Sequence, residues 1–297
     1  MTLDQLRIFL EVARHQHVTR ASEALNLTQS SVSGAIKALE NRHGVRLFDR
    51  MGRRIVLTAE GSMFLPVAEE LLANAGNAER LLEDLSGTGI GKLHIFTSQT
   101  IASHWLPQRL RAFRETWPRV TIELLVGNTG QCVAAIEAGT TDVAFIEAKV
   151  DEHFLDQTLV GADELCLVAG TLHPWVDVPP KDLSELFSTR WIMREKGSGT
   201  RSTFEAELRR NGLSPENLDI LLALPSNEAV CAAVADSGCA TVISRAVADP
   251  YIGAGRMIEL PLALPGRPFH MIRHKGRHRS HALGLLEEMI LRSELKG

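Results

Sequence analysis

The feature that most constrains this chain is a short helical pattern that follows Thr28. Apolar residues recur at Val32, Ile36 and Leu39, at spacings of four and three, so they share one face of a helix. The opposite face carries side chains that can hydrogen-bond to bases or phosphates, namely Gln29, Ser30, Ser33 and Lys37. A helix with an apolar back and a short polar front fits the major groove of DNA.

The neighbouring segments complete a small module. Helices are predicted over about 4–15 and from Val18, with Thr19 as the N-cap of the second, and Asn26-Leu27-Thr28 forms the turn before the third. Gly44 is a natural end for the third helix. Two extended runs at 45–50 and 53–57 then predict a wing, whose arginines would lie at the minor groove or along the phosphates.

A long amphipathic helix is predicted from its N-cap Thr58 to about Leu85. Its apolar residues step by four or three along one face: Phe64, Ala68, Leu72, Ala75, Ala78, Leu82 and Leu85. Because a single helix of this length has no surface in its own chain to bury that seam, we expect helix 58–86 to pair with a second copy. The alternative is that the seam packs on the chain's own C-terminal domain.

The charge distribution agrees with a DNA-binding N-terminus. Residues 1–60 hold nine Lys and Arg against six Asp and Glu, a net charge of +3, whereas the whole chain carries −4 and the remainder therefore −7. A basic module on an acidic body favours contact with a phosphate backbone at one end only. A chance fluctuation in composition is the alternative explanation.

Composition and length exclude several other classes of protein. The 44% hydrophobic and 23% charged residues are ordinary for a globular protein, and 297 residues suffice for about two domains. The four cysteines show no metal-binding spacing, and Cys132 and Cys166 are expected to be buried. No secretory leader and no membrane-spanning apolar run is visible. We therefore expect a cytoplasmic protein with reduced thiols.

Taken together, the N-terminal motifs resemble the winged helix-turn-helix of the LysR-type transcriptional regulators. The matching pieces are Leu6-x-x-Phe9, Ala21-Ser22-x-Ala24-Leu25, Thr28-Gln29-Ser30-Ser31-Val32-Ser33, Ile36-x-x-Leu39-Glu40, Gly44-Val45-Arg46-Leu47-Phe48-x-Arg50 and Leu57-Thr58-x-x-Gly61. The chain departs from the family at Gly34 and Ala35, where larger polar or basic residues are common. The expected DNA contacts are Thr28, Gln29, Ser30, Ser31, Ser33, Lys37, Arg50, Arg53 and Arg54.

Strands and helices alternate through the rest of the chain, which favours parallel sheets with helices on both faces. Predicted strands are 92–97, 120–126, 142–146, 164–169, 190–193, 220–224, 240–244, 257–260 and 269–273. Predicted helices are 101–116, 131–138, 181–186, 200–211, 227–236, 246–249 and 281–295. Order and spacing resemble the effector domain of the same family, which is similar to periplasmic binding proteins.

The expected organisation is an all-α winged helix-turn-helix domain followed by an α/β body. The first covers 1–58, and a linker helix and hinge cover 59–90, with a glycine-rich joint at 87–91. The α/β effector-binding body covers 91–297. Its two α/β subdomains are expected at 91–161 with 268–297, and at 162–267.

Two segments of this body fit a ligand site, because open α/β sheets bind at the carboxyl ends of strands beside helix N-termini. One is Thr97-Ser98-Gln99-Thr100; the other, 194–201, contains Ser198, Thr200 and Arg201. Their hydroxyls, glycine-exposed amides and arginine favour a small oxyanion or carboxylate clamped from both sides. Taken singly, these Ser and Thr residues are also ordinary helix caps.

The family resemblance adds further cleft loops. The full expected effector set is Ser98, Gln99, Thr100, Glu147, Ser198, Thr200, Arg201, Ser226, Asn227 and Ser244. Glu147 would repel an anion if it faced inward; it could instead hold Arg201 or Lys196, or bind an amino group. Ser98-x-Thr100 is similar to the motif of sulfur-responsive members, which makes a sulfur oxyanion one candidate.

No enzymatic or metal site is predicted. Ser198 lies in no Gly-x-Ser-x-Gly elbow. His270 and His274 are spaced by four in or beside a predicted strand, about 13 Å apart, which is too far to share a metal ion. We therefore expect no catalytic residue, metal or cofactor.

The sequence instead predicts a transcriptional regulator that binds double-stranded DNA as a dimer or tetramer and responds to a small, anionic effector. The alternative is a solute-binding protein or small-molecule enzyme with the same α/β body, against which the N-terminal 86 residues argue.

Overall fold

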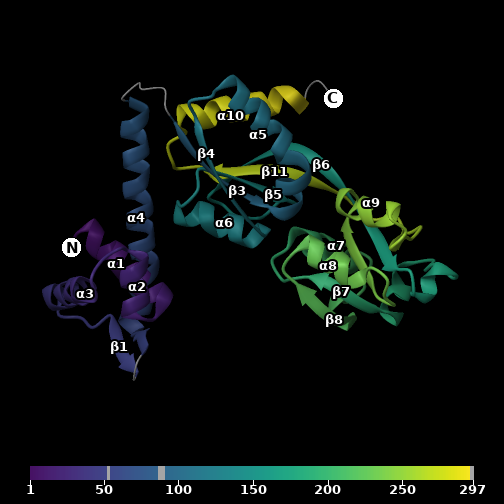
Figure 1. Ribbon diagram of the computed structural model, residues 1–297, viewed down its shortest axis with the longest axis horizontal. Coiled ribbons are helices and arrows are strands. Elements are labelled where there is room, and N and C mark those ends of the chain that lie inside the picture. The colour runs from purple at the N-terminus through teal and green to yellow at the C-terminus, as the bar shows by residue number, and fades with distance from the viewer. Residues whose placement is uncertain (52–53, 86–90, 295–297) are drawn as a thin grey trace. The chain divides into compact units, whose positions relative to one another are not determined.

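The computed structural model describes residues 1–51, 54–85 and 91–294. The chain divides into two compact units, Met1–Gly87 and Thr88–Gly297 (Figure 1). The predicted glycine-rich joint lies outside the described residues, apart from Gly91. Arg53 of the predicted wing also lies outside them.

Three helices, a two-stranded wing and a long fourth helix make up the N-terminal unit. They are α1 (Leu3–His15), α2 (Val18–Ala24), α3 (Gln29–His43), β1 (Phe48–Met51), β2 (Arg54–Leu57) and α4 (Ala59–Leu85). Thr28 caps α3 by accepting a hydrogen bond from the Ser31 amide, and Gly44 ends it in the left-handed region with φ of 65°. The predicted cap of α2 at Thr19 was wrong: the N-cap is His17, which makes no side-chain cap bond.

The core of this unit is built around Phe9, which is fully buried. Its ring lies 5.3 Å from that of Phe48 in the wing and 5.1 Å from that of Phe64 in α4. Val32 and Leu39 of α3 are also buried, as their spacing predicts. The apolar back of α3 therefore fixes the helix to the core and leaves its polar face outward.

The structure corrects the expectation that α4 has no surface in its own chain for its apolar seam. Phe64, Ala68 and Leu72 pack on the core of the N-terminal unit, where α4 contacts α1. Leu82 and Leu85, at the other end of the seam, are exposed. A second row of apolar side chains is exposed on the same helix: Met63, Val67 and Leu71.

The C-terminal unit is built on a β-sheet. The strands are β3 (Lys92–Ser98), β4 (Thr121–Gly127), β5 (Val143–Glu147), β6 (Leu155–Gly170), β7 (Arg190–Arg194), β8 (Asp219–Leu224), β9 (Ala240–Ser244), β10 (Met257–Glu259) and β11 (Gly266–His274). The helices are the π-helix η1 (Ile101–Trp105), α5 (Leu106–Thr116), α6 (Thr129–Ala138), the 3₁₀ turns η2 (Pro174–Val176), η3 (Leu183–Ser188) and η4 (Pro215–Asn217), α7 (Gly199–Arg210), α8 (Asn227–Val234), α9 (Arg245–Gly253) and α10 (His281–Glu294).

The nine strands form one sheet of order β4-β3-β5-β11-β6-β9-β7-β8, with β10 on β6. The expectation of parallel sheets holds for two groups of strands, but the sheet as a whole is mixed. Strands β3, β4 and β5 form one parallel group, and β7, β8 and β9 form another. Between them, β11 runs antiparallel to both β5 and β6. Strand β6 in turn runs antiparallel to β9 and β10. The two antiparallel strands β6 and β11 are the crossovers between two parallel groups.

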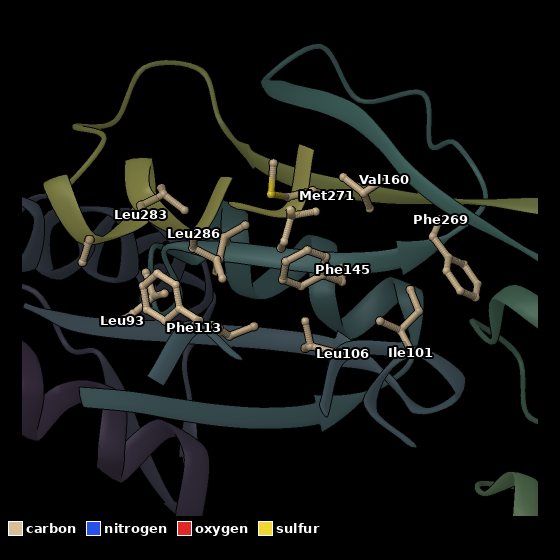
Figure 2. Packing of buried hydrophobic residues seen from close by; sticks show 14 of the residues in the cluster. Leu93, Ile101, Leu106, Phe113, Phe145, Val160, Phe269, Met271, Leu283 and Leu286 are labelled. Atoms are coloured by element: carbon tan, nitrogen blue, oxygen red, sulfur yellow. The ribbon is translucent and has the colours of Figure 1, made fainter. Parts of the chain in front are cut away.

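The sheet therefore carries two lobes. The first lobe has β3, β4 and β5, with α5 and α10 on one face and α6 on the other (Figure 1). Its core brings Leu93, Phe113, Phe145 and Leu286 together, as Figure 2 shows. The second lobe has β7, β8 and β9. Alternate residues of β7 enter different cores, Trp191 and Met193 with α7 and Ile192 with α8, as the pleat requires.

The cysteines are free and buried, as predicted for Cys132 and Cys166. Burial raises the pKa of the Cys166 and Cys231 thiols to about 12. Within the part of the chain that the structure describes, we find no helix that could cross a lipid bilayer.

Candidate functional site

The polar face of α3 is exposed to solvent. Gln29, Ser30, Ser33 and Lys37 are all exposed. The Thr28 hydroxyl lies 2.9 Å from that of Ser30 and 2.8 Å from that of Ser31, so the cap also orders the first turn of the helix. A rigid, short polar surface of this kind is suited to base edges in a groove.

Of the three wing arginines that were expected to contact DNA, the structure describes the side chain of one. Arg54 is exposed at the start of β2. Arg50 pairs through its backbone with Ile55, and Arg53 is outside the described residues. Thr58 Oγ1 donates to the Arg46 carbonyl at 2.8 Å and accepts from the Gly61 amide at 2.9 Å, which ties the wing to the start of α4.

In the C-terminal unit, the end of β3 joins the two lobes directly. Gln99 Nε2 donates to the Pro225 carbonyl at 2.7 Å, and Gln99 Oε1 accepts from the Asn227 amide at 3.0 Å. Thr100 Oγ1 accepts from Asn227 Nδ2 at 3.2 Å. The π-helix η1 begins directly after Thr100, and such helices are frequent at functional sites. These predicted residues therefore meet at the junction of the lobes.

Arg267 lies at the centre of this junction, with a side chain that is 0% exposed. Its Nη1 donates to Glu147 Oε2 at 2.6 Å and to Thr200 Oγ1 at 2.8 Å. Its Nη2 donates to Thr100 Oγ1 at 3.1 Å and to Asp163 Oδ2 at 2.6 Å. Thr100 and Thr200, which come from different lobes, are thus held by one guanidinium group.

Asp163 completes the Arg267 cluster, which we define as Arg267, Glu147 and Asp163. Asp163 Oδ2 also accepts from Arg267 Nε at 3.0 Å, and Asp163 Oδ1 accepts from the Ser244 hydroxyl at 3.1 Å. One guanidinium faces two buried carboxylates, so the cluster is formally negative. Glu147 therefore pairs with Arg267, and not with Arg201 or Lys196 as the sequence had suggested.

A second buried arginine lies nearby. Arg194 donates to both oxygens of Glu195, at 2.8 and 3.0 Å, and its Nη1 bonds Asn227 Oδ1. Burial raises the pKa of Glu195, but the hydrogen bonds from Arg194 and Asn128 and the Arg194 charge outweigh it, and the pKa lies below its ordinary value. Arg194 is therefore already neutralised within the protein.

Two predicted residues make contacts other than those expected. Arg201 was expected as the cation of an anion clamp, but its guanidinium donates to Glu205 at 2.7 Å and to the Arg194 carbonyl at 3.1 Å. Ser226 caps α8 by accepting from the Ala229 amide at 3.0 Å. Arg201 and Ser226 therefore form hydrogen bonds within or next to their own helices.

Three buried hydroxyls near this junction have no hydrogen-bond partner among the described residues: Ser98, Thr129 and Ser198. Ser98 ends β3 opposite Gly127 of β4, and Thr129 follows two residues later as the first residue of α6. Ser198 is the N-cap residue of α7 but makes no side-chain cap bond. The two helix starts meet where the Gly130 amide donates to the Gly197 carbonyl at 3.3 Å.

Glu147 Oε1, at the same junction, is also buried without a hydrogen-bond partner among the described residues. A Cβ at position 199 would lie 2.7 Å from the Glu147 carbonyl oxygen and 2.9 Å from Oε2. Only glycine permits this approach, so the chain brings Glu147 against the first turn of α7. Since buried polar groups in native proteins are almost always satisfied, the unpaired hydroxyls and Oε1 make this junction the candidate ligand site.

Sequence reasoning missed Arg267, Asp163 and Thr129. Thr129 could have been found, because Asn128-x-x-Gln131 is a capping-box pattern directly after a strand. Arg267 offered no signal, since its partners are distant in the sequence.

Comparison with known proteins agrees with this architecture. Residues 3–62 match the model described as bacterial regulatory helix-turn-helix protein, lysR family, and residues 86–294 match that of the LysR substrate binding domain. The chain is 33% identical over 285 residues to the uncharacterized HTH-type transcriptional regulator YeiE of Escherichia coli K12, covering 95% of this chain and 94% of that protein. It is 28% identical to the RuBisCO operon transcriptional regulator of Allochromatium vinosum, covering 98% and 96%.

Solved structures share the fold. Full-length CbnR complexed with its target DNA superposes with a TM-score of 0.68 at 21% identity, covering 99% of this chain and 100% of that one. The effector binding domain of QuiR in complex with shikimate gives 0.62 at 16% identity, covering 69% and 98%. The sequence relatives are transcriptional regulators and not enzymes. On the two family matches that together span most of its length, this chain belongs to the LysR family of DNA-binding transcriptional regulators.

Proposed function

We propose that this regulator reads DNA with the exposed face of α3 and changes its DNA binding when a small oxyanion enters the junction of the two lobes. The α3 contacts would be Thr28, Gln29, Ser30, Ser31, Ser33 and Lys37, with Arg50, Arg53 and Arg54 of the wing on the phosphates. The similar CbnR structure is a complex with target DNA, which supports this use of the fold.

The observation that carries the effector proposal is the set of buried, unpaired hydroxyls of Ser98, Thr129 and Ser198. Hydroxyls and helix N-termini can hold an anion without a free cation, because amide dipoles and O–H donors supply the positive potential. Both nearby buried arginines are already paired with carboxylates. A sulfur oxyanion remains a specific candidate on the Ser98-x-Thr100 motif, and the similar QuiR domain is a complex with shikimate.

Such a ligand can act only if it favours one arrangement of the subunits over another. We place the oligomer contact on α4, where Met63, Val67, Leu71, Leu82 and Leu85 are exposed. A dimer or a pair of dimers would present two α3 helices to two half-sites. The protein would act in the cytoplasm, together with its DNA target.

The test is fluorescence anisotropy of the full chain on a labelled duplex from the region upstream of its own gene. Addition of sulfate, phosphate or a small carboxylate is expected to change the apparent Kd or the footprint. A Ser98→Ala, Ser198→Ala double variant should bind DNA as the wild type does but lose that response, whereas the control Ser214→Ala, at an exposed serine that makes no side-chain cap bond, should keep it. A response that survives the double variant would place the effector elsewhere.

A further inference from the structure

We infer that the effector carries a hydrogen-bond donor beside its oxyanion, and that Glu147 selects for that donor; this rests on the proposed function. Glu147 is 2% exposed at the end of β5. Its Oε2 is engaged by Arg267 at 2.6 Å, while its Oε1 has no partner among the described residues. A carboxylate oxygen can only accept, so whatever meets Oε1 must bring a proton.

The position of Glu147 places this acceptor at the proposed oxyanion site. Its carboxylate lies against the first turn of α7 at Gly199, between Ser198 and Thr200 in the chain. Thr200 and Glu147 share the same Arg267 nitrogen. Three potential O–H donors and one obligate acceptor therefore lie in the same region, and a ligand that fills it must offer both acceptors and a donor.

Charge leads to the same requirement. Arg267 is shared between Glu147 and Asp163, so the Arg267 cluster has one carboxylate more than it has guanidinium groups. A fully deprotonated oxyanion beside Glu147 would meet like charge and would leave Oε1 buried and unpaired, which is unfavourable. An oxyanion with an O–H or N–H turned toward Oε1 replaces that repulsion with a charge-assisted hydrogen bond.

The inferred ligand class has two sources. One is an inorganic oxyanion that keeps a proton near neutral pH, such as hydrogen phosphate. The other is a small organic acid with a hydroxyl or amino group beside its carboxylate. Both present the same chemistry to Glu147, and matched pairs of probes that differ by one donor separate them.

The experiment is isothermal titration of the full chain at pH 7.5 with two such pairs, phosphate against sulfate and glycolate against acetate. The donor-bearing member of a pair should bind at least about tenfold more tightly, because a site with a buried polar group rejects an analogue that leaves it unpaired. A preference in the first pair indicates the inorganic source, and one confined to the second pair indicates the organic source.

Asp163 provides a matched control for Glu147. Asp163→Asn removes one negative charge from the same cluster, but both Asp163 oxygens are already engaged, by Arg267 and by Ser244. Glu147→Gln removes the same charge, keeps the side-chain shape and turns the unpaired acceptor into an amide. The donor preference should fall to within about twofold in Glu147→Gln and persist in Asp163→Asn.

Each other outcome overturns the inference. If probes bind but neither pair shows a preference for its donor-bearing member, Glu147 makes no selection, although the proposed oxyanion site stands. If both variants lose the preference equally, net charge is responsible and not the Oε1 acceptor. If none of the four probes binds, the proposed effector class fails and the inference fails with it. The wild-type ratios decide the question even if Glu147→Gln does not fold.

Discussion

Arg267 offers a sharp test of how the two lobes are joined. Arg267→Met keeps the length of the side chain but leaves Glu147 and Asp163 buried without their cation, and it removes the bonds to Thr100 and Thr200. Loss of one partner from a buried ion pair typically lowers the free energy of unfolding by about 3–5 kcal/mol. For a unit of this size, that corresponds to a fall in Tm of about 6–20 °C.

Differential scanning calorimetry of the full chain measures this fall, and Arg245→Met is the matched control. Arg245 makes two bonds of 2.6 Å to Glu259, but its side chain is 40% exposed. Solvent screening should make the loss of stability in that variant much smaller than in Arg267→Met. Adding Glu147→Gln and Asp163→Asn to Arg267→Met should restore most of the stability. An Arg267→Met loss no larger than the control's would refute the buried, paired description of this arginine.

Three further predictions concern other parts of the chain. Lys37→Ala should weaken binding to all DNA sequences and lower the slope of log K against log salt concentration by about 1, whereas Gln29→Ala should change base preference. If the two variants change base preference equally in a binding-site selection, these roles are contradicted. Gly34→Ala should raise the stability of the N-terminal unit by about 1 kcal/mol in a denaturant titration, because the position is helical and nothing lies within 4 Å of an added Cβ. Burial and the Lys149 charge hold the pKa of His270 below its ordinary 6.5. The unfolded chain therefore takes up a proton more readily, and Tm should fall as pH drops below about 6.5, less so in His270→Gln; an unchanged pH profile in that variant would contradict the assignment.

Local signals in the sequence predicted the third helix of the N-terminal unit well, although they misplaced the cap of α2. Thr28 and Gly44 cap α3, and the apolar spacing at Val32 and Leu39 matches the buried face. Caps and helical periodicity depend on neighbours within a few residues, so they are visible without any knowledge of the fold.

The crossover strands were harder to predict. Only 164–169 of β6 was expected, while the strand begins at Leu155. Its first half contains Asp156, Gln157, Thr158 and Gly161, which interrupt the apolar pattern because this part runs between the lobes beside β11. Tertiary pairing overrides local propensity in such a segment.

The candidate site was predicted only in its local parts. Ser98, Thr100, Ser198 and Thr200 follow from the rule that ligands bind where strands end and helices begin. Arg267 was missed because its bonds reach Asp163, 104 positions away, and Thr100, 167 positions away. Contacts across such distances arise from sheet order, which the sequence pattern does not specify.

The account depends most on an oxyanion seated at the start of α7, and hydrogen–deuterium exchange of the full chain tests this most directly. First-turn amides of a helix lack intrahelical acceptors and exchange readily unless a ligand binds them. With the tightest-binding of the four titration probes at saturation, exchange at 199–201 and at Thr129 is predicted to slow, while the exposed edge strand β8 should not change. Protection confined to other segments, with 199–201 unchanged, would contradict the proposed site.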